Sequence, residues 1–517
     1  MGILFIALVT ADSLPDGDSL PVYQAPEVVA TACFPGLRAE TLALEDTPQR
    51  ALRRMGLYDY GGMITPGLSG LPSRHTRVLI QGIQVNSPAT GSVDLSLIPF
   101  HLLAGGIATL SGRPELALWL PDDSEARLFA GAFGLVGAAG FARTGPALFG
   151  LSFRRADNCY SYRDEFSRPA VRTNADEAQV ALASLFRNNS LSALFVGSLT
   201  ERGSPGPIGS PTPLARLSDT LILAAFSVGH LNISGTREAL IYSDAPLFSR
   251  TVSTSLGLSW SAGPLILEAS RASALGARSY CVKALVALAR REWFCRFGAL
   301  VWDGPRSSLV FPMAEVGLHL SPVRAVAFYD AVPPAVNDLA WPDDGFSVGN
   351  PLLSPERMFG GELGLDFGLA RAWASLRFVD DYIAWIPGDR WTPANLQGVL
   401  SPELGASLNT GLFEAGISYN PVRWQTRRLA NVPDVRGWLA LFVGPAWFSL
   451  DYTGARVSTP GGIRELPGFL MLDAGLSLSA REFATEISVL NLLDQTPQQV
   501  AGYPLSGRSF RVEISRR

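Results

Sequence analysis

Apolar and polar side chains alternate, one residue at a time, over most of the chain from position 252 onward. In the stretch 252–260, Leu256, Leu258 and Trp260 alternate with glycine and serine residues. Because a β-strand turns successive side chains to opposite faces, each such stretch has one apolar face and one polar face. The same pattern recurs at 315–321, 362–368, 413–420, 470–479 and 510–515.

This recurrence favours one fold class. A soluble β-sandwich alternates over far fewer strands, whereas a transmembrane barrel alternates along most of its chain, apolar toward lipid and polar toward the lumen. Aromatic residues such as Trp260, Tyr419 and Trp447 stand near the ends of the predicted strands, as they do at membrane interfaces. The pattern predicts an all-β transmembrane protein, an antiparallel outer-membrane β-barrel. Barrels whose lumen is plugged have about 22 strands.

The composition and the absence of known catalytic motifs argue against two classes of function. Charged residues make up only 17% of the 517 positions, and the formal net charge is −4. A chain without a basic surface would release few counterions from phosphates, so no binding of nucleic acid is expected. The sequence holds no nucleophile elbow, phosphate loop or zinc-ligand spacing, and its 4 histidines are scattered. We therefore expect no enzyme activity, no cofactor and no metal site.

Two short apolar segments need separate interpretation. Residues 3–9 form an apolar core followed by Thr10 and Ala11, small residues of the kind that precede a cleavage site. We interpret 1–11 as a secretory signal peptide that lacks the usual basic start, as expected if translation begins farther upstream; the alternative is that this segment is not a signal peptide. The stretch 128–142 is only about 15 residues long, too short to cross a membrane as a helix, and predicts strands instead.

The cysteine pattern leaves two alternatives open. Cys281 and Cys295 lie on either side of a predicted strand–turn–strand segment. In an oxidising compartment they could form a cross-strand disulfide, and two free thiols fit the spacing equally well.

The first quarter of the chain differs from the rest. Residues 12–26 are rich in Pro and Asp, as in a mobile leader, and are followed by a brief β-prone patch at 27–32. Farther on, two apolar runs at 78–80 and 83–86 flank Gln81-Gly82. This arrangement predicts a tight hairpin, because glycine supplies the backbone conformation that a two-residue turn requires.

Several segments resemble one known family in the same order and at similar spacings. Their residues are EVVATA at 27–32, VLIQGIQVNSPATGSVDLSLIP at 78–99, GSPGPIGSPTPLARLSD at 203–219, GNPLLSPE at 349–356, LPGF at 466–469 and NLLD at 491–494. In these motifs the chain resembles the TonB-dependent outer-membrane receptors, most closely the branch that contains the cobalamin receptors. The resemblance runs from about residue 26 to the end of the chain.

The resemblance implies a division of the chain. Residues 12–36 would be a periplasmic leader with a TonB box, 37–125 a small α+β plug domain inside the lumen, and 126–517 the barrel. The implied TonB box is Glu27, Val28, Val29, Ala30, Thr31 and Ala32. The implied plug core includes Val78, Leu79, Ile80, Gly82, Val85, Asn86, Asp94 and Pro99.

The implied function is the import of a scarce ligand, either cobalamin or a ferric siderophore, with energy from the inner-membrane proton gradient. TonB would pair with the box, and outer-membrane lipid and lipopolysaccharide would surround the barrel. The family's usual state is a monomer. The residues that bind the ligand are not assigned by the sequence.

Two departures from the family pattern bear on this function. The family's plug has Arg-Gly at two places where this chain has Ser69-Gly70 and Ser111-Gly112. Because those arginines pair with barrel glutamates, we expect fewer buried ion pairs here. The chain also ends in Ser515-Arg516-Arg517, where an aromatic residue is usual.

These departures keep two other functions open. One is a plugged barrel with a structural or adhesive role and no coupled transport. The other is a passive porin with a loose or vestigial N-terminal domain.

Overall fold

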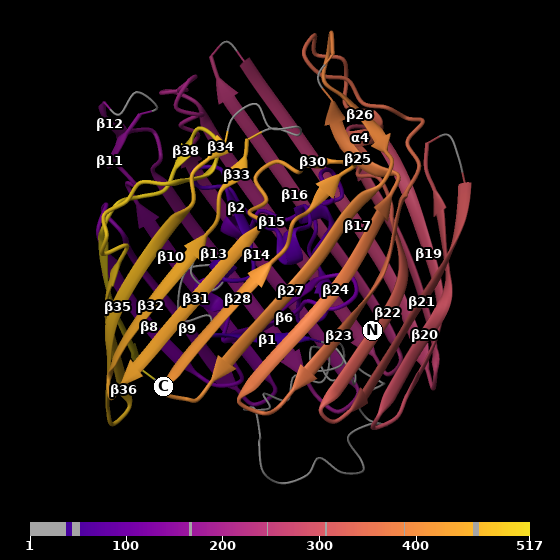
Figure 1. The fold of residues 1–517 in the computed structure, drawn as a ribbon, viewed down its shortest axis with the longest axis horizontal. Helices are drawn as coiled ribbons and strands as arrows, with labels where there is room; N and C mark the ends of the chain where they lie inside the picture. Colours follow the sequence, from indigo (N-terminus) through magenta and orange to yellow (C-terminus); the bar gives the residue numbers. More distant parts are fainter. Residues whose placement is uncertain are drawn as a thin grey trace.

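A closed β-barrel encloses a small N-terminal domain in the computed structural model of this chain (Figure 1). The structure describes residues 38–43, 52–164, 168–245, 247–305, 308–386, 388–458 and 465–516. Over these ranges, 22 long antiparallel strands form the barrel, and β39 pairs with β8 to close it. The predicted all-β transmembrane fold is therefore confirmed, and the barrel belongs in a bacterial outer membrane.

The barrel strands follow one another around the wall in chain order. They are β8 (Glu125–Gly131), β9 (Val136–Thr144), β10 (Ala147–Ala156), β13 (Glu177–Arg187), β14 (Leu191–Gly203), β15 (Arg216–Val228), β16 (Leu231–Asp244), β17 (Leu247–Ala262), β18 (Leu265–Ala274), β19 (Ala277–Ala289), β20 (Trp293–Asp303), β21 (Ser308–Leu320), β22 (Val323–Val332), β23 (Glu356–Asp366), β24 (Ala370–Asp380), β27 (Val399–Asn409), β28 (Phe413–Tyr419), β31 (Val435–Val443), β32 (Ala446–Thr453), β35 (Phe469–Ala480), β36 (Phe483–Leu490) and β39 (Ser509–Arg516).

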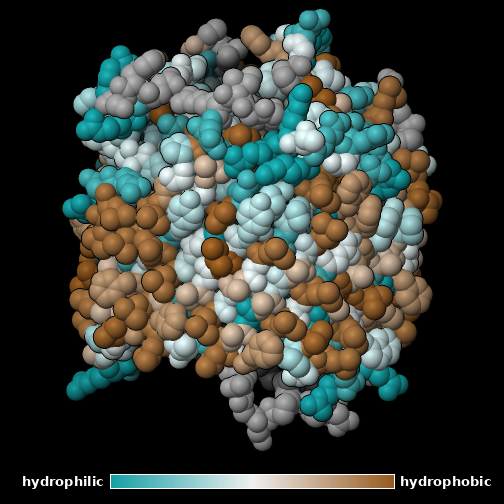
Figure 2. Space-filling view, in the orientation of Figure 1, coloured by the Kyte–Doolittle hydropathy of each residue, from teal (hydrophilic) through white to brown (hydrophobic). Residues whose placement is uncertain are grey.

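The sequence alternation becomes two chemically different faces of the wall. On β17, Leu256 and Leu258 are exposed on the outside, whereas Ser253 is buried on the inside. Figure 2 shows hydrophobic residues gathered in a broad band over the strands, with hydrophilic residues above it. The hydrocarbon layer of a membrane requires such an apolar outer face, because it offers no hydrogen-bond partner to a polar side chain.

Connections at the two ends of the barrel differ in length. At one end the strands are joined by short turns, and at the other several long connections carry their own elements. Long loops mark the extracellular end of such barrels. The elements there are α4 (Val336–Ala340), β11 (Tyr160–Arg163), β12 (Pro169–Arg172), β25 (Tyr382–Ile386), β26 (Thr392–Leu396), β29 (Arg423–Trp424), β30 (Arg427–Arg428), β33 (Arg456–Val457), β34 (Glu465–Leu466), β37 (Gln498–Val500) and β38 (Tyr503–Pro504).

The N-terminal domain lies within the barrel (Figure 1) and is built on a five-stranded sheet in the order β1-β6-β7-β4-β5. Val78 and Ile80 of this sheet are fully buried and belong to one apolar cluster with Leu148 of β10 and Leu223 of β15. We call this domain the plug. Its elements are β1 (Ala39–Ala43), β2 (Leu57–Asp59), β3 (Ile64–Pro66), η1 (Leu68–Gly70), η2 (Ser73–His75), β4 (Arg77–Ile80), β5 (Ile83–Gln84), η3 (Leu95–Leu97), η4 (Phe100–Leu102), β6 (Gly105–Thr109) and β7 (Glu115–Trp119).

Local predictions of secondary structure agree with the fold. Strands β4 and β5 form the expected hairpin, with a positive φ of 51° at Gln81 and 82° at Gly82. The apolar stretch 128–142 forms parts of β8 and β9. In the described part of the chain, no helix has the length and apolar character needed to cross a membrane.

The two cysteines of β19 and β20 are free thiols. Cys281 lies opposite Trp302, and Cys295 lies opposite Leu288, so the two stand at different heights on the paired strands. Of the two alternatives left by the sequence, the structure therefore supports free thiols over a disulfide.

A charge on the lipid face tests the transmembrane assignment. Leu376 lies near the middle of β24 and is 52% exposed to the outside. Leu376→Arg is expected to lower the free energy of unfolding by about 2–4 kcal/mol, because a cation near the bilayer midplane has no polar partner. The measurement is denaturant unfolding in lipid vesicles.

The matched control is the same substitution outside the membrane. Leu352 is 73% exposed in the connection between β22 and β23, so Leu352→Arg should leave stability almost unchanged. Equal losses for the two variants would contradict the placement of β24 across the bilayer.

Candidate functional site

The residues assigned to the plug core by resemblance lie together in the β4–β5 region and the segment that follows it. Val78, Ile80 and Val85 are buried, and Pro99 precedes η4. Asn86 accepts a hydrogen bond from the Val78 N–H (2.8 Å) and donates to the carbonyl oxygens of Thr76 and Gly91. Of the remaining three, Leu79 is half-buried, Gly82 completes the hairpin turn, and Asp94 contacts the barrel wall. The TonB box at 27–32 lies outside the described residues.

One buried ionic cluster connects the start of the plug to the wall. Arg38 donates to both carboxylate oxygens of Glu403 on β27 (3.1 Å each) and lies 3.8 Å from Glu362 on β23. The guanidinium also stacks 4.5 Å from the Trp373 ring, whose Nε1 donates to Glu403. Arg377 lies 3.4 Å from Glu403, so this carboxylate has cationic partners from both plug and wall.

Arg38 takes part in a buried ion pair that the sequence motifs did not indicate. Ser111 occupies one of the two positions where the family has arginine, and its Oγ accepts from the Arg38 N–H (2.7 Å) and donates to Glu362 (3.0 Å). The carbonyl of Ser69, at the other position, accepts from Asn420 (2.9 Å). An arginine from a different position is thus the ionic partner of the wall here. The sequence motifs gave no indication of this role, because Arg38 lies in none of them.

A second cluster joins the plug to the opposite part of the wall. Asp94 accepts a 2.6 Å hydrogen bond from Arg202 of β14, which also donates to Asp219 of β15 (3.0 Å). Asp94 further accepts from the backbone N–H groups of Ile64 and Ser96. Here the carboxylate belongs to the plug and the arginine to the wall, the reverse of the Arg38 cluster.

The extracellular element α4 lies over the apex of the plug. The backbone N–H groups of Val336 and Asn337 donate to the carbonyl oxygens of Pro88 and Ala89 (3.0 and 2.9 Å). The side chains at this contact are apolar, since Val336 packs with Ala89 of the plug and Ala274 of β18. These contacts close the outer end of the barrel on this side.

Asp338 of α4 joins three separate parts of the molecule. It accepts from Arg74 of the plug (2.9 Å), from the indole N–H of Trp385 on β25 (3.0 Å) and from the Ala335 N–H (3.1 Å). Burial acts to lower the pKa of Arg74, but the carboxylates of Asp338 and Glu356 raise it above its ordinary value. Arg74 therefore stays charged and Asp338 is paired. No sequence pattern marks Asp338 as a contact to the plug.

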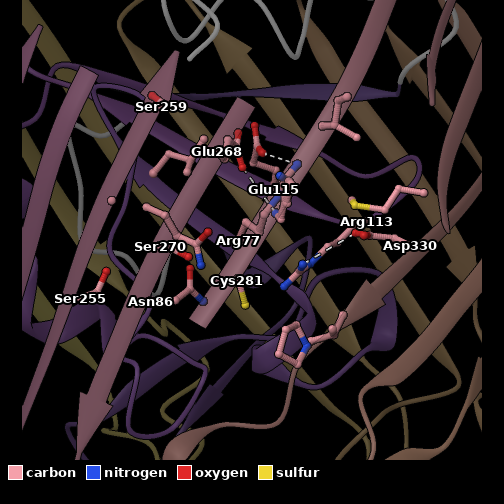
Figure 3. A pocket seen from close by; sticks show the side chains of 18 of the residues that line it. Arg77, Asn86, Arg113, Glu115, Ser255, Ser259, Glu268, Ser270, Cys281 and Asp330 are labelled. Carbon is pink, nitrogen blue, oxygen red and sulfur yellow. Dashed lines mark ion pairs between the residues drawn. The ribbon is translucent and has the colours of Figure 1, made fainter. Parts of the chain in front are cut away.

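A polar cavity of about 440 Å³ lies between the plug and strands β16–β22 (Figure 3). Arg77, Glu115 and Arg113 face it from the plug, and Ser255, Ser270 and Cys281 face it from β17, β18 and β19. Burial acts to lower the pKa of Arg77, but Glu115, which lies 2.8 Å away, and Asp330 raise it. Arg77 therefore keeps its charge at the wall of the cavity.

Metal binding receives no support from the described side chains, which contain no group of three or more histidine, cysteine or acidic residues able to hold an ion. His75 instead lies 3.1 Å from Glu356 with both side chains fully buried, and it stacks on Tyr382 of β25. This histidine forms a contact between plug, wall and outer hairpin. Burial raises the pKa of Tyr382 above its ordinary value, so its hydroxyl is neutral.

Comparison with curated proteins finds partial similarity to vitamin B12 transporters. The chain is 27% identical over 234 residues to the vitamin B12 transporter BtuB of Vibrio vulnificus, covering 39% of this chain and 37% of that protein. It is 25% identical over 202 residues to BtuB of Photobacterium profundum, covering 34% and 32%. The similarity therefore spans about a third of the length of these relatives. No family model matches the chain.

Comparison with solved structures covers nearly the whole chain. The ferric enterobactin receptor PfeA from Pseudomonas aeruginosa has a TM-score of 0.68 at 11% identity, over 92% of this chain and 99% of that one. The copper transporter OprC has a TM-score of 0.67 at 14% identity, over 92% and 98%. The FrpB iron transporter from Neisseria meningitidis has 0.66 at 13%, over 93% and 99%. At these identities the likeness shows the shared fold.

Removing one carboxylate tests the Arg38 cluster. Glu403→Ala is expected to lower the free energy of unfolding by about 3–5 kcal/mol, because Arg38 and Arg377 would lose their shared buried partner. Glu414→Ala removes a partly exposed partner of Arg54 and should cost less than about 1 kcal/mol. Denaturant titration of both variants in the same vesicles provides the measurement, and losses of equal size would contradict the anchoring role of Glu403.

Proposed function

We propose that the chain, which has the plugged-barrel fold of the TonB-dependent receptors, imports a scarce ligand across the outer membrane with energy delivered by TonB. One observation carries this proposal: the plug is held inside the barrel by buried ion pairs on two sides, at Arg38 and at Asp94. Separating one partner of a buried pair costs about 3–5 kcal/mol, so thermal motion rarely clears the lumen. An importer with such a plug needs an external source of work.

The work would be transmitted through residues 27–32. An extended segment that adds as a strand to a sheet of TonB binds through its main chain, as in other cases of β-augmentation. This pairing explains why a run containing Val28, Val29 and Thr31 suits the role, because β-branched residues favour the extended backbone. Ser111 and Ser69 do not weaken the proposal, since Arg38 supplies the ionic anchor.

Cobalamin is the ligand class that we propose first, and ferric siderophores come second. The curated relatives with partial similarity are vitamin B12 transporters, which favours cobalamin. The structural neighbours include a ferric enterobactin receptor, and for this reason we propose ferric siderophores as the second ligand class. A ligand arriving from outside would meet α4 and the β25–β26 hairpin, where Asp338 and Trp385 are joined.

A proline substitution in the proposed TonB box at 27–32 distinguishes coupled import from a passive porin and from a structural or adhesive role. Val29→Pro is expected to abolish uptake of the transported ligand, because proline cannot donate a backbone hydrogen bond to a neighbouring strand. Val29→Thr keeps both the N–H group and the β-branched side chain, so it should retain uptake. The measurement is uptake of labelled cobalamin, and separately of a ferric siderophore, into cells that lack other receptors for these ligands.

The proton gradient supplies the second arm of the experiment. Collapsing it should reduce uptake by the unaltered protein to the level of Val29→Pro. Uptake that survives both treatments would indicate a passive porin. No uptake of either ligand by the unaltered protein would favour the structural or adhesive role.

A further inference from the structure

The cavity of about 440 Å³ exists because one sector of the barrel wall carries small inward side chains. The lining residues of this sector include Ser234, Ser255, Gly257, Ser259, Ser270 and Ser279. In other sectors the inward side chains are large, such as Arg202 and Arg377, and contact the plug directly. Ser270 remains exposed although it faces the lumen, which marks open space between wall and plug.

Six basic and four acidic residues line the cavity, and all four acidic residues are paired. The ion pairs are Arg77–Glu115 (2.8 Å), Arg113–Asp330 (3.7 Å), Lys283–Glu268 (3.7 Å) and Arg296–Glu315. Of the other two basic residues, Arg74 pairs with Asp338 of α4, and Arg271 lies on the outward face of β18 opposite Leu256, so the part of the lining that faces the lumen has its charges paired. A passage of this kind excludes neither cations nor anions by long-range repulsion.

The lining runs along most of the height of the wall. At the extracellular end it includes Pro333 and Ala335, which precede α4. At the other end it includes Ser259, Ile266 and Ala287, each within three residues of a periplasmic strand end. The space therefore follows β17–β19 from beneath α4 to the level of the periplasmic turns.

The outer end of the cavity meets a compact apolar contact. There Ala89 of the plug, Val336 of α4 and Ala274 of β18 are buried together, and Ala272, Ala277 and Ala340 pack against them. Cys281 lies directly beneath this contact, because it lines the cavity and also packs in the cluster of Leu339. The Asp338–Arg74 ion pair holds α4 in this position.

We propose that this cavity is a passage for small hydrophilic solutes of either charge, separate from TonB-coupled import, and that α4 closes it at the outer end. Its volume lies in the range of small-molecule sites, about 300–1,000 Å³, so it suits solutes smaller than a cobalamin. Opening requires that α4 leaves Ala89 and Ala274, and this also breaks its backbone hydrogen bonds to the plug and the Asp338–Arg74 pair. The plug can keep its anchors at Arg38 and Asp94.

Releasing α4 is the first test. Asp338→Ala removes the partner of Arg74 and Trp385, and we expect it to raise single-channel conductance several-fold over the nearly closed unaltered protein in planar bilayers without TonB. In a salt gradient the reversal potential should show that both ions pass, with a modest preference for the anion, because Arg74 in the lining loses its carboxylate partner in this variant. A folded Asp338→Ala barrel, verified by heat-modifiable migration, that conducts no more than the unaltered protein would overturn the proposal.

A filling substitution locates the path. In the Asp338→Ala protein, Ser270→Trp should remove the added conductance, because the indole would occupy the cavity. Leu267→Trp is the matched control: Leu267 lies on the other face of β18, is 40% exposed and does not line the cavity, so conductance should persist. Conductance that is unaffected by Ser270→Trp would place the path elsewhere and refute the proposal.

Cys281 provides an independent readout. With the other three cysteines replaced by serine, a membrane-impermeant methanethiosulfonate added from outside should label Cys281 several-fold faster in Asp338→Ala than in the parent. Equal labelling rates would show that α4 does not close the cavity. None of these measurements uses TonB, so failure here leaves coupled import untouched, and failure of uptake leaves the passage untouched.

Discussion

The hydrocarbon interior of the membrane offers no hydrogen-bond partner to a peptide group, and the rest of this structure depends on that constraint. Each backbone N–H and C=O must pair within the wall, so the sheet has to close, as β39 does on β8. Closure over 22 strands then forces half of the wall positions toward a wide lumen. A wall with lipid on one side and a lumen on the other explains the alternation in the sequence, since residues such as Leu256 face lipid and Ser255 faces inward.

A lumen of this width cannot be filled by wall side chains, and this explains the plug and the chemistry that holds it. Plug and wall share an apolar cluster along β10–β15, and elsewhere the inner wall is polar and contacts the plug through ion pairs and hydrogen bonds. Such contacts require large side chains with matched geometry, as at Arg38–Glu403 and Arg202–Asp94. Where the wall has serine and glycine instead, plug and wall separate and a cavity results. The side chains at the interface between plug and wall therefore determine both where the plug is anchored and where the cavity lies.

The sequence predicted those features whose causes are local. Alternation needs only neighbouring residues, and the β4–β5 hairpin needs only Gln81 and Gly82, so both were predictable. The Arg38–Glu403 pair joins positions 365 apart, and no periodicity connects them. The family pattern gives the usual positions of two arginines and contains no information on Arg38. The state of Cys281 depends equally on strand register, which the local pattern leaves undetermined.

Besides two backbone hydrogen bonds and an apolar contact, one buried carboxylate joins α4 to the plug, and this carboxylate has a consequence for motion. Asp338 is 2% exposed and depends on Arg74 and Trp385 for its partners. A buried charge that loses its partners must regain water or a new partner, at a cost of several kcal/mol. Helix α4 can therefore move away from the plug only if Arg74 moves with it or Asp338 becomes solvated. Either event also changes the plug apex, because the N–H groups of α4 bond to the carbonyls of Pro88 and Ala89. The outside of the barrel and the plug thus form one mechanical unit on the side where the wall is hollow.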